Sequence, residues 1–574
     1  MNLRLIVFIY ISGHFMLSAQ KYDFNWISGY GKSVLSPSGS YFGVQIFDFN
    51  TGNFRIIPAP QTELDFSGAN GIISNRGGEL LYYCNGYSLE YGNHMKVPGA
   101  QELNNTYGAL SLADAQTVLF LPHPDGSNRY LMLYGKDSLS KIDNYGRWST
   151  ADFRYMIFDN TKDSLRGTVE IRDQILFRDT LLSGRLTACR HANGRDWWIL
   201  VPERNAYGYY RVLIDNKGPH LIDKQFIQEK FVEGISQVCF SPHGDYYVSQ
   251  TANHDGSFTY LFAFDRSTGL LSLKAKQVNG FSNAKGVSFS PNNKLLYISL
   301  TQKVIQYDLK AVDIFNSGII IDSIDKWPRF GLNYERHLLA PDGRIYINSS
   351  ASAESIHYIE HPNVRGLGCG IHRSGIKTTY NRTLSNHPYY RLGPLDGSTC
   401  DTLGINNIPW AWWRYDQDST EHLKIQFVDA SAYEVEEWYW DFGDGNRSRD
   451  TSPLHTYSKN GVYQVCLIVK NKNGADTLCR TLYIGVVSNS DPNKNIDFQL
   501  FPNPFTSVMI INVNDYLPTK MLMTLYDLQG KAVLHRRLYQ GSNVIDVEGL
   551  NSGVYVVEIK EQGIVVKSEK LVKM

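Results

Sequence analysis

One pattern recurs seven times in the first two-thirds of the chain: an apolar run, a turn of the Ser-Pro-x-Gly kind and a second apolar run. The clearest copy is residues 238–249, VCFSPHGDYYVS. The turn residues are Gly39, Gly77, Gly126, Gly194, Gly244, Asn293 and Gly343, which lie 38, 49, 68, 50, 49 and 50 residues apart. A period of about 40–50 residues with several strands per period is typical of propeller blades. The spacing predicts an all-β chain that begins with a β-propeller, with seven blades expected and six or eight left open.

The chemistry of the turn explains why the pattern marks strand ends. Proline fixes φ and cannot donate to a sheet, and the Gly or Asn that follows accepts a positive φ. A second recurrent feature is an aspartate after a later strand, at Asp48, Asp159, Asp215, Asp265 and Asp308. Because such a carboxylate can accept a hydrogen bond from the backbone two residues on, we expect these residues to cap turns rather than to catalyse.

The composition narrows the function class. Lys plus Arg total 56 and Asp plus Glu total 56, so the formal net charge is zero. This balance lacks the basic surface of nucleic-acid binders, and we expect no nucleic-acid partner. The chain has 37 Tyr, 27 Phe and 48 Gly against 9 Met, which favours strands and turns.

The first 19 residues have the plan of a secretory signal peptide. One positive charge precedes a mostly apolar run, and small residues lead to a predicted cut between Ala19 and Gln20. No later run approaches the ~18 apolar residues of a transmembrane helix. We therefore expect an exported chain without a transmembrane segment.

Export permits disulfide bonds, and all seven cysteines follow the predicted cut. Cys466 and Cys479 flank the turn NKNG at residues 471–474, which places them opposite each other in a hairpin. They form the predicted disulfide. Cys369 and Cys400 could close a second loop. The strands of the blades are expected to hold Cys84, Cys189 and Cys239, where free thiols act as small apolar residues.

Residues 20–405 form the predicted propeller. Its long third step, residues 134–186, suggests one blade plus an excursion on the rim. Residues 71–86, 115–130, 186–200 and 362–369 resemble exported bacterial proteins with an N-terminal propeller of the WD40/YVTN-like type. The resemblance implies a binding or scaffolding unit and no established reaction.

Residues 406–423 are predicted to be a linker, although they contain Trp410, Trp412 and Trp413. These aromatics could form an exposed binding surface. We expect instead that they pack between neighbouring domains.

Residues 424–487 are predicted to form a compact β unit. The segments WDFGDG and HTYS, followed by GVYQV, resemble a PKD domain, an immunoglobulin-like sandwich. The motif residues are Trp440, Asp441, Phe442, Gly443, Asp444 and Gly445. Asp441 and Asp444 could hold calcium, but two carboxylates are few for a calcium site, and turn capping is the favoured interpretation. The resemblance implies spacing, adhesion or carbohydrate contact rather than catalysis.

A polar linker, residues 488–496, leads to a last β module at residues 497–574. This module closely resembles the type A C-terminal sorting domain of the type IX secretion system. The residues that carry the resemblance are Pro502, Asn503, Pro504, Gly530, Gly553 and Tyr555. It implies recognition by the type IX secretion machinery, a periplasmic intermediate, and a final place outside the cell or on the outer-membrane surface.

No catalytic motif of a zinc protease, an α/β-hydrolase or a phosphate-binding loop is present in the sequence. We therefore expect a non-enzymatic binding or adhesion scaffold without a cofactor, whose propeller presents a face to a surface protein or glycan and whose PKD unit acts as a spacer. The alternative is an exported propeller hydrolase or lyase that acts on a polysaccharide or a lactone-like substrate, with its active site in the central opening.

Overall fold

The structure is a computed structural model. It describes residues 20–31, 42–52, 54–59, 61–104, 115–142, 148–163, 166–204, 207–229, 235–253, 256–280, 284–324, 333–349, 353–418, 421–484, 498–501, 504–513, 521–527, 530–538, 541–561 and 564–573. The predicted signal peptide, with Ala19, lies outside these residues.

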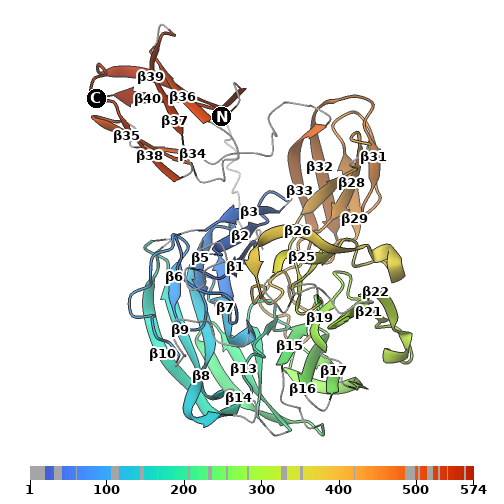
Figure 1. The fold of residues 1–574 in the computed structure, drawn as a ribbon. Helices are drawn as coiled ribbons and strands as arrows, with labels where there is room; N and C mark the ends of the chain where they lie inside the picture. The colour runs from blue at the N-terminus through green and yellow to red at the C-terminus, as the bar shows by residue number, and fades with distance from the viewer. Residues whose placement is uncertain are drawn as a thin grey trace, which may run out of the picture.

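The strands up to Asn381 form seven consecutive sheets in the described residues, each with neighbouring strands antiparallel and paired in chain order (Figure 1). The first four sheets are β1 (Asn25–Gly29), β2 (Val44–Asp48), β3 (Arg55–Pro58); β4 (Gly71–Ser74), β5 (Leu80–Cys84), β6 (Leu89–Tyr91); β7 (Val118–Pro122), β8 (Arg129–Ile142), β9 (Trp148–Asp159), β10 (Thr168–Leu181); and β11 (Ala188–Arg190), β12 (Trp197–Pro202), β13 (Gly208–Asp215), β14 (Gly218–Phe226).

The other three sheets are β15 (Ile235–Phe240), β16 (Tyr246–Asn253), β17 (Gly256–Asp265), β18 (Leu270–Asn279); β19 (Ala284–Phe289), β20 (Leu295–Leu300), β21 (Lys303–Asp308), β22 (Ile319–Ser323); and β23 (His337–Leu339), β24 (Ile345–Ile347), β25 (Ala353–Ile359), β26 (Ile371–Asn381). Three short 3₁₀ helices, η1 (Ala115–Thr117), η2 (Phe315–Ser317) and η3 (Gly366–Cys369), lie in the connections. The last strand, β26, contacts β1 and β2, so the seventh sheet packs beside the first. The all-β propeller expected from the repeat is the fold of this region.

The recurrent turn joins the first two strands of a sheet. Gly126, Gly194, Gly244, Asn293 and Gly343 all have positive φ, between 59° and 82°. In the second sheet the positive φ belongs to Gly78 rather than to the predicted Gly77, and Gly39 lies outside the described residues. The turn is therefore a structural requirement of the repeat.

The recurrent aspartates cap turns, as predicted. The Oδ1 atom of each accepts a hydrogen bond from the backbone N–H two residues later, at 2.7–2.9 Å. The five carboxylates are those of Asp48, Asp159, Asp215, Asp265 and Asp308.

The long third step is not a blade with a separate excursion, and this expectation was wrong. The extra residues lengthen the third sheet, whose strands β8, β9 and β10 have 14, 12 and 14 residues. The pairing of β8 with β9 continues to Ile142 and Trp148. The polar segment continues the strands, so its polarity did not mark a loop.

Residues 413–484 form a sandwich of two sheets. One contains β27 (Trp413–Gln417), β28 (Lys424–Asp429) and β31 (Leu454–Thr456); the other contains β29 (Glu437–Asp441), β30 (Arg447–Ser448), β32 (Gly461–Asn471) and β33 (Gly474–Ile484). Residues 406–423 are therefore not a free linker, because β27 is paired with β28 from Trp413 to Gln417. The stretch belongs to the sandwich because one of its aromatic residues, Trp413, lies in the sandwich core beside Phe427 and Trp440.

The C-terminal residues form a second sandwich. Its sheets are β34 (Phe498–Phe501), β35 (Val508–Val513), β38 (Gly541–Asp546) and β36 (Met521–Tyr526), β37 (Ala532–Leu538), β39 (Gly553–Glu561), β40 (Ile564–Lys573). A separate apolar core, which includes Phe505, Met523 and Val557, fills the space between them. The module therefore has a core of its own, as an independent domain requires.

Cys466 and Cys479 form a disulfide across the β32–β33 hairpin, with their Cα atoms 4.0 Å apart. The second possible pair does not form, since Cys369 and Cys400 are both free. Cys369 lies in the core between the sixth and seventh sheets. Cys84, Cys189 and Cys239 are free as well, and burial raises the pKa of all three thiols.

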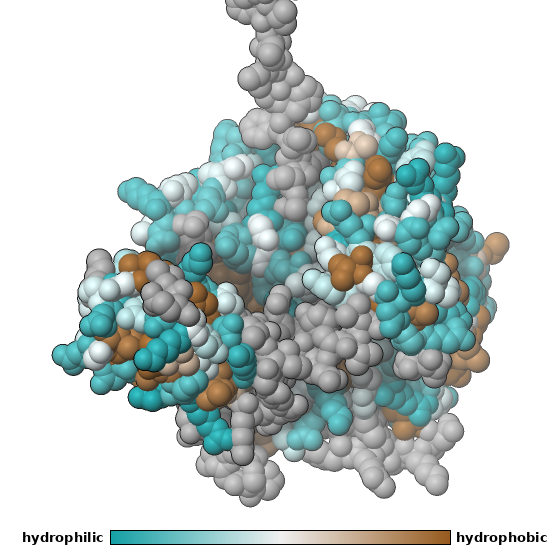
Figure 2. All heavy atoms as spheres, turned by 90° about the horizontal axis from the view of Figure 1, so that it is seen from above, coloured by the Kyte–Doolittle hydropathy of each residue, from teal (hydrophilic) through white to brown (hydrophobic). Residues whose placement is uncertain are grey.

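The surface seen from above is mostly hydrophilic, with small separate apolar groups (Figure 2). Among the described residues no helix has the length and apolar character needed to cross a membrane.

Candidate functional site

The central opening of the propeller is bounded by the first strand of each sheet. These first strands contact one another from sheet to sheet: β1 contacts β4, β4 contacts β7, β15 contacts β19, and β19 contacts β23. The chain that follows β26 then enters the ring they form. Ser385 Oγ accepts a hydrogen bond from Ile27 N at 2.9 Å, and Tyr390 OH donates to Phe120 O at 2.8 Å. Residues 383–391 therefore occupy the opening.

Asn386 is the most connected residue of this segment. Its Nδ2 atom donates to Val118 O at 2.9 Å and to Leu186 O at 3.0 Å, and its backbone N–H donates to Asn70 O at 2.6 Å. One residue, through its side chain and its backbone, thus ties the second, third and fourth sheets together. It is buried, so these bonds are not exchanged with water.

Two glutamines add further hydrogen bonds between neighbouring sheets around the central opening. Gln116 Nε2 donates to Val238 O at 2.9 Å and to Asn386 Oδ1 at 3.2 Å. Gln237 Oε1 accepts from Val287 N and His337 N, both at 3.0 Å. The amide groups of Asn386, Gln116 and Gln237 are therefore used for structure. The sequence did not predict this role for Asn386 because its segment follows the last repeat.

A cavity of about 70 Å³ remains beside the segment. His337 lines it, with Nδ1 3.1 Å from Ser288 Oγ, and burial lowers the pKa of this histidine to about 3. A space of this size holds a few water molecules rather than a sugar or a peptide. A larger ligand must bind elsewhere on the propeller.

A much larger cleft, about 690 Å³, lies where the propeller meets the sandwich of residues 413–484. The propeller contributes the turns of the sixth and seventh sheets, and the sandwich contributes β28, the start of β29 and the residues before β31. The lining includes Asn292, Lys294, His361, Asn363, Tyr389, Arg391, Gln426, Asp429, Ser431, Trp438 and Ser452. Aromatic rings among amide, hydroxyl and charged groups can stack on and hydrogen-bond to a polar ligand.

The two walls of this cleft are held together by charged groups that are buried or half-buried. Arg414, on β27, has no exposed side-chain surface; its Nε atom donates to Asp342 O and its Nη2 atom to Glu360 O, both at 2.9 Å. Arg344, on the propeller, pairs with Glu360 at 2.6 Å and with Asp416 at 2.5 Å. Because positive and negative groups come from both domains, the cleft has a fixed geometry.

Tryptophans strengthen the same junction. Trp410 and Trp412 are buried and stack on each other, and Trp412 lies edge-on to Phe24 of the propeller. Arg480 and Lys21 cover the face of Trp412. These rings pack between domains, as expected, and do not form an exposed binding surface.

Asp429 is a carboxyl of the cleft whose pKa is shifted upward. Burial raises the pKa of this carboxyl to about 6, against the lowering effect of Ser431 and Trp438. Ser431 N donates to Asp429 Oδ1 at 3.2 Å. The carboxyl therefore changes charge in mildly acidic solution, and a ligand hydroxyl group could supply it with a further hydrogen bond.

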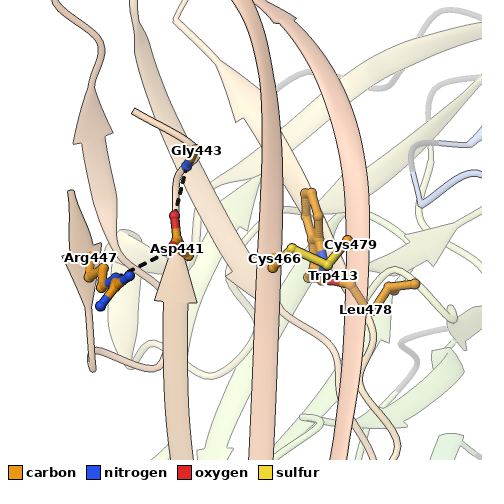
Figure 3. Close-up of a disulfide and its surroundings, with 7 residues drawn as sticks. All are labelled: Trp413, Asp441, Gly443, Arg447, Cys466, Leu478 and Cys479. Carbon is orange, nitrogen blue, oxygen red and sulfur yellow. Dashed lines mark hydrogen bonds and ion pairs between the residues drawn. A yellow bond between two sulfur atoms is a disulfide. The ribbon is translucent and has the colours of Figure 1, made fainter. Parts of the chain in front are cut away.

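The two carboxylates of the acidic turn cap that turn, which is the interpretation that the sequence favoured. Asp441 accepts from Gly443 N at 3.0 Å and pairs with Arg447 at 3.1 Å (Figure 3). Asp444 accepts from Asn446 N and pairs with His455 at 2.9 Å. Both carboxylates are already engaged with donors. No cluster of three or more potential metal ligands occurs in the described part of the chain.

The other motif residues of the sandwich have structural roles. Trp440 and Phe442 belong to its core, and Trp440 Nε1 donates to Asp450 O at 3.0 Å. Gly443 and Gly445 have φ of 78° and 94°, and a Cβ on Gly443 would lie 2.6 Å from Gln464 O. The turn therefore requires glycine, and the motif marks the fold rather than a site.

The predicted sorting residues are only partly described. Pro502 and Asn503 lie outside the described residues, as does the predicted cleavage residue Ala19, whereas Gln20 is described and buried. Pro504 precedes Phe505, which is buried in the C-terminal core. Tyr555 OH donates to Asn551 O at 2.7 Å, and Gly530 and Gly553 have positive φ.

The cleft residues Trp438, Asp429 and Tyr389 were missed by sequence reasoning. They belong to no recurrent motif, and residues from 292 to 452 meet there only in three dimensions. The one signal in the sequence that pointed to a binding site was the aromatic content of residues 438–440. These residues were interpreted instead as a strand of the WDFGDG motif.

Comparisons with known proteins identify two modules. The PKD domain family matches residues 406–486, and the secretion system C-terminal sorting domain family matches residues 499–574. Collagenase ColQ1 of Bacillus cereus (strain Q1) is 38% identical over 76 residues, which are 12% of this chain and 8% of the collagenase. The chain thus spans only a small part of that relative.

Solved structures with similar parts include the PKD1 domain of Vibrio anguillarum Epp, at 28% identity over 14% of this chain and 95% of that one, with a TM-score of 0.13. The Dos1 propeller is similar at 12% identity over 59% of this chain and 75% of that one, with a TM-score of 0.32. The propeller assignment itself comes from the strand order described above.

The sorting domain indicates a protein that is secreted or attached to the outer-membrane surface. Its family also implies contact with the type IX secretion machinery. The chain is therefore an exported multi-domain protein in which a β-propeller precedes a PKD domain and a type IX secretion C-terminal sorting domain.

Proposed function

We propose that the protein is a non-enzymatic binding protein of the cell exterior, and that it holds a glycan in the cleft between the propeller and the PKD domain. The observation that carries this proposal is the cleft itself, about 690 Å³ in volume, with Trp438 and Tyr389 among polar groups of both domains. Aromatic faces stack on the apolar side of sugar rings, and the surrounding amides and carboxyl groups bond to hydroxyl groups.

The fixed docking of the two domains supports the same function. The ion pairs of Arg414, Arg344, Glu360 and Asp416 hold both walls before a ligand arrives. A preformed cleft loses little conformational entropy on binding. In this arrangement the PKD domain forms one wall of the site in addition to separating the propeller from the sorting domain.

The alternative of a hydrolase or lyase has less support. It would use the central opening, where residues 383–391 lie and where a cavity of only about 70 Å³ remains. The propeller turns above the opening are made of structural glycines and capping aspartates.

A glycan array followed by a turnover assay tests the proposal. The mature protein should bind a subset of polysaccharides and release no product from those polysaccharides, from lactones or from peptides. Trp438→Ala should lose most of this binding, because it removes the stacking surface. Tyr483→Ala is the matched control, since Tyr483 is an exposed aromatic of the same domain outside the cleft. Turnover, or equal loss in both variants, would contradict the proposal.

A further inference from the structure

A second large pocket lies on the propeller, between the recurrent turns of the second, third and fourth sheets. Its volume is about 510 Å³, and none of its lining residues lines the cleft beside the PKD domain. The lining includes Gln20, Tyr22, Arg76, His123, Asp125, Asn128, Arg129, Tyr130, Arg190, Arg195 and Asn216. Four arginines and one aspartate give the pocket an excess of positive groups.

Arg190 is the central residue of this pocket. It ends β11 and is only 6% exposed. Its guanidinium lies over the ring of Trp197, 3.7 Å from the centroid, and donates to Arg195 O and to Gln20 Oε1. These two bonds use two of the five N–H groups of the guanidinium. The buried Nε atom has no partner.

No carboxylate of the described residues forms an ion pair with Arg190. The nearest candidates are used elsewhere: Asp196 pairs with Arg195 at 2.7 Å, and Asp125 pairs with Arg129 at 2.8 Å. Burial accordingly lowers the pKa of Arg190 to about 10. A buried cation without a paired carboxylate is costly, and an anion from outside would relieve that cost.

Tyr22 adds a further polar group. Burial raises the pKa of its hydroxyl, and Tyr22 lines the same pocket as Arg190 and Arg76. An oxyanion could therefore accept hydrogen bonds from Arg190 and from the tyrosine hydroxyl together. Arginine is well suited to this task because its N–H groups match the geometry of carboxylate and sulfate oxygens.

We propose that this pocket binds an oxyanion, the carboxylate or sulfate group of an acidic ligand, through Arg190 at its base. The site is separate from the glycan cleft, so it gives the protein a second point of attachment. A ligand that reaches both would be bound more tightly than one that reaches either.

Calorimetric titration of the mature full chain tests this site with sodium glucuronate, sodium sulfate and glucose at constant ionic strength. Glucuronate and sulfate should bind and glucose should not; tighter binding of glucuronate points to an acidic sugar, and tighter binding of sulfate points to a sulfate group or a free inorganic oxyanion. Arg190→Gln should weaken binding of the anions by about tenfold or more. Arg211→Gln is the matched control, because Arg211 is also buried but pairs with Asp223 outside this pocket.

Absence of binding by the wild-type chain, or equal affinity of Arg190→Gln and wild type, would overturn the proposal. If Arg190→Gln does not fold, crystals of the wild-type protein soaked in selenate test the oxyanion site instead. An anomalous peak within hydrogen-bond distance of Arg190 supports the site, and peaks elsewhere without one at Arg190 refute it. None of these results depends on Trp438, so the proposed glycan function can fail or succeed independently.

Discussion

Identical residue types have different roles in this protein, and the surroundings of each side chain decide between them. Asp265 caps a turn on the surface, with Ser267 N at 2.8 Å. Asp429 lies in the cleft beside Trp438, and burial raises the pKa of its carboxyl to about 6. The sequence places the first residue in a recurrent pattern, which made its role predictable. The second has no pattern, because its neighbours come from distant parts of the chain.

Asp429 leads to a prediction of pH-dependent stability. Its pKa is raised from the ordinary 3.8 to about 6, so the folded state binds the proton more tightly than the unfolded state. The contribution of Asp429 to stability is therefore lost as pH rises from about 4 to about 6, so the wild-type protein should lose stability over this range relative to Asp429→Asn. Asp429→Asn should remove this loss and be more stable than wild type above pH 6, by about 3 kcal/mol.

Urea unfolding at several pH values between 4 and 8, followed by tryptophan fluorescence, measures this effect. Asp441→Asn is the control, since Asp441 lies in an exposed turn of the same domain and pairs with Arg447. If the free energy of unfolding varied with pH in the same way for wild type and Asp429→Asn, the Asp429 carboxyl would not be the cause of the pH dependence.

At the scale of elements, the repeat predicted the fold well because its turns are local. A proline, a glycine with positive φ and a capping aspartate each act within a few residues of sequence. The length of the third sheet was not predictable in the same way. Its strands β8 to β10 extend beyond the repeat, and their polar residues have the composition of a loop. The position of residues 383–391 in the central opening was not predicted. Their own sequence contains no pattern that indicates which strands they contact.

Two turn glycines provide a matched test of this account. Gly244 has φ of 71°, and a Cβ there would lie 2.8 Å from Cys189 Sγ, Arg266 Cδ and Leu392 Cδ2. Gly126 has φ of 77° and no atom within 4 Å of the same position. Gly126→Ala should cost about 1 kcal/mol from backbone strain, and Gly244→Ala about 3 kcal/mol from strain and crowding together. Thermal unfolding measures both, and an equal loss in the two variants would contradict the turn geometry.

At the scale of the whole molecule, we expect the docked propeller and PKD domain to unfold together in one transition. Arg414→Ala tests this, since it removes the cation that reaches Asp342 and Glu360 across the junction. The change should destabilise the docked state by about 3 kcal/mol and separate one unfolding transition into two in a calorimetric scan. Arg447→Ala, in an exposed pair of the PKD domain, should leave the scan nearly unchanged. A single unshifted transition in Arg414→Ala would mean that the junction contributes little.

The sorting domain determines where this unit is delivered. Removal of residues 498–574 should leave the propeller and PKD domain folded, because the C-terminal sandwich has its own core. The truncated protein should then accumulate in the periplasm. Cell fractionation with immunodetection measures this, and normal delivery to the cell exterior would contradict the role of the domain.

The central claim is that the ligand binds in the cleft between the two docked domains. A crystal structure of the mature protein with the glycan that binds most tightly on the array tests it most directly. The account predicts a sugar ring stacked on Trp438, with its hydroxyl groups bonded to cleft residues such as Asp429 and Asn363. A glycan bound in the central opening, or on the outer strands of a blade with the cleft empty, would contradict it.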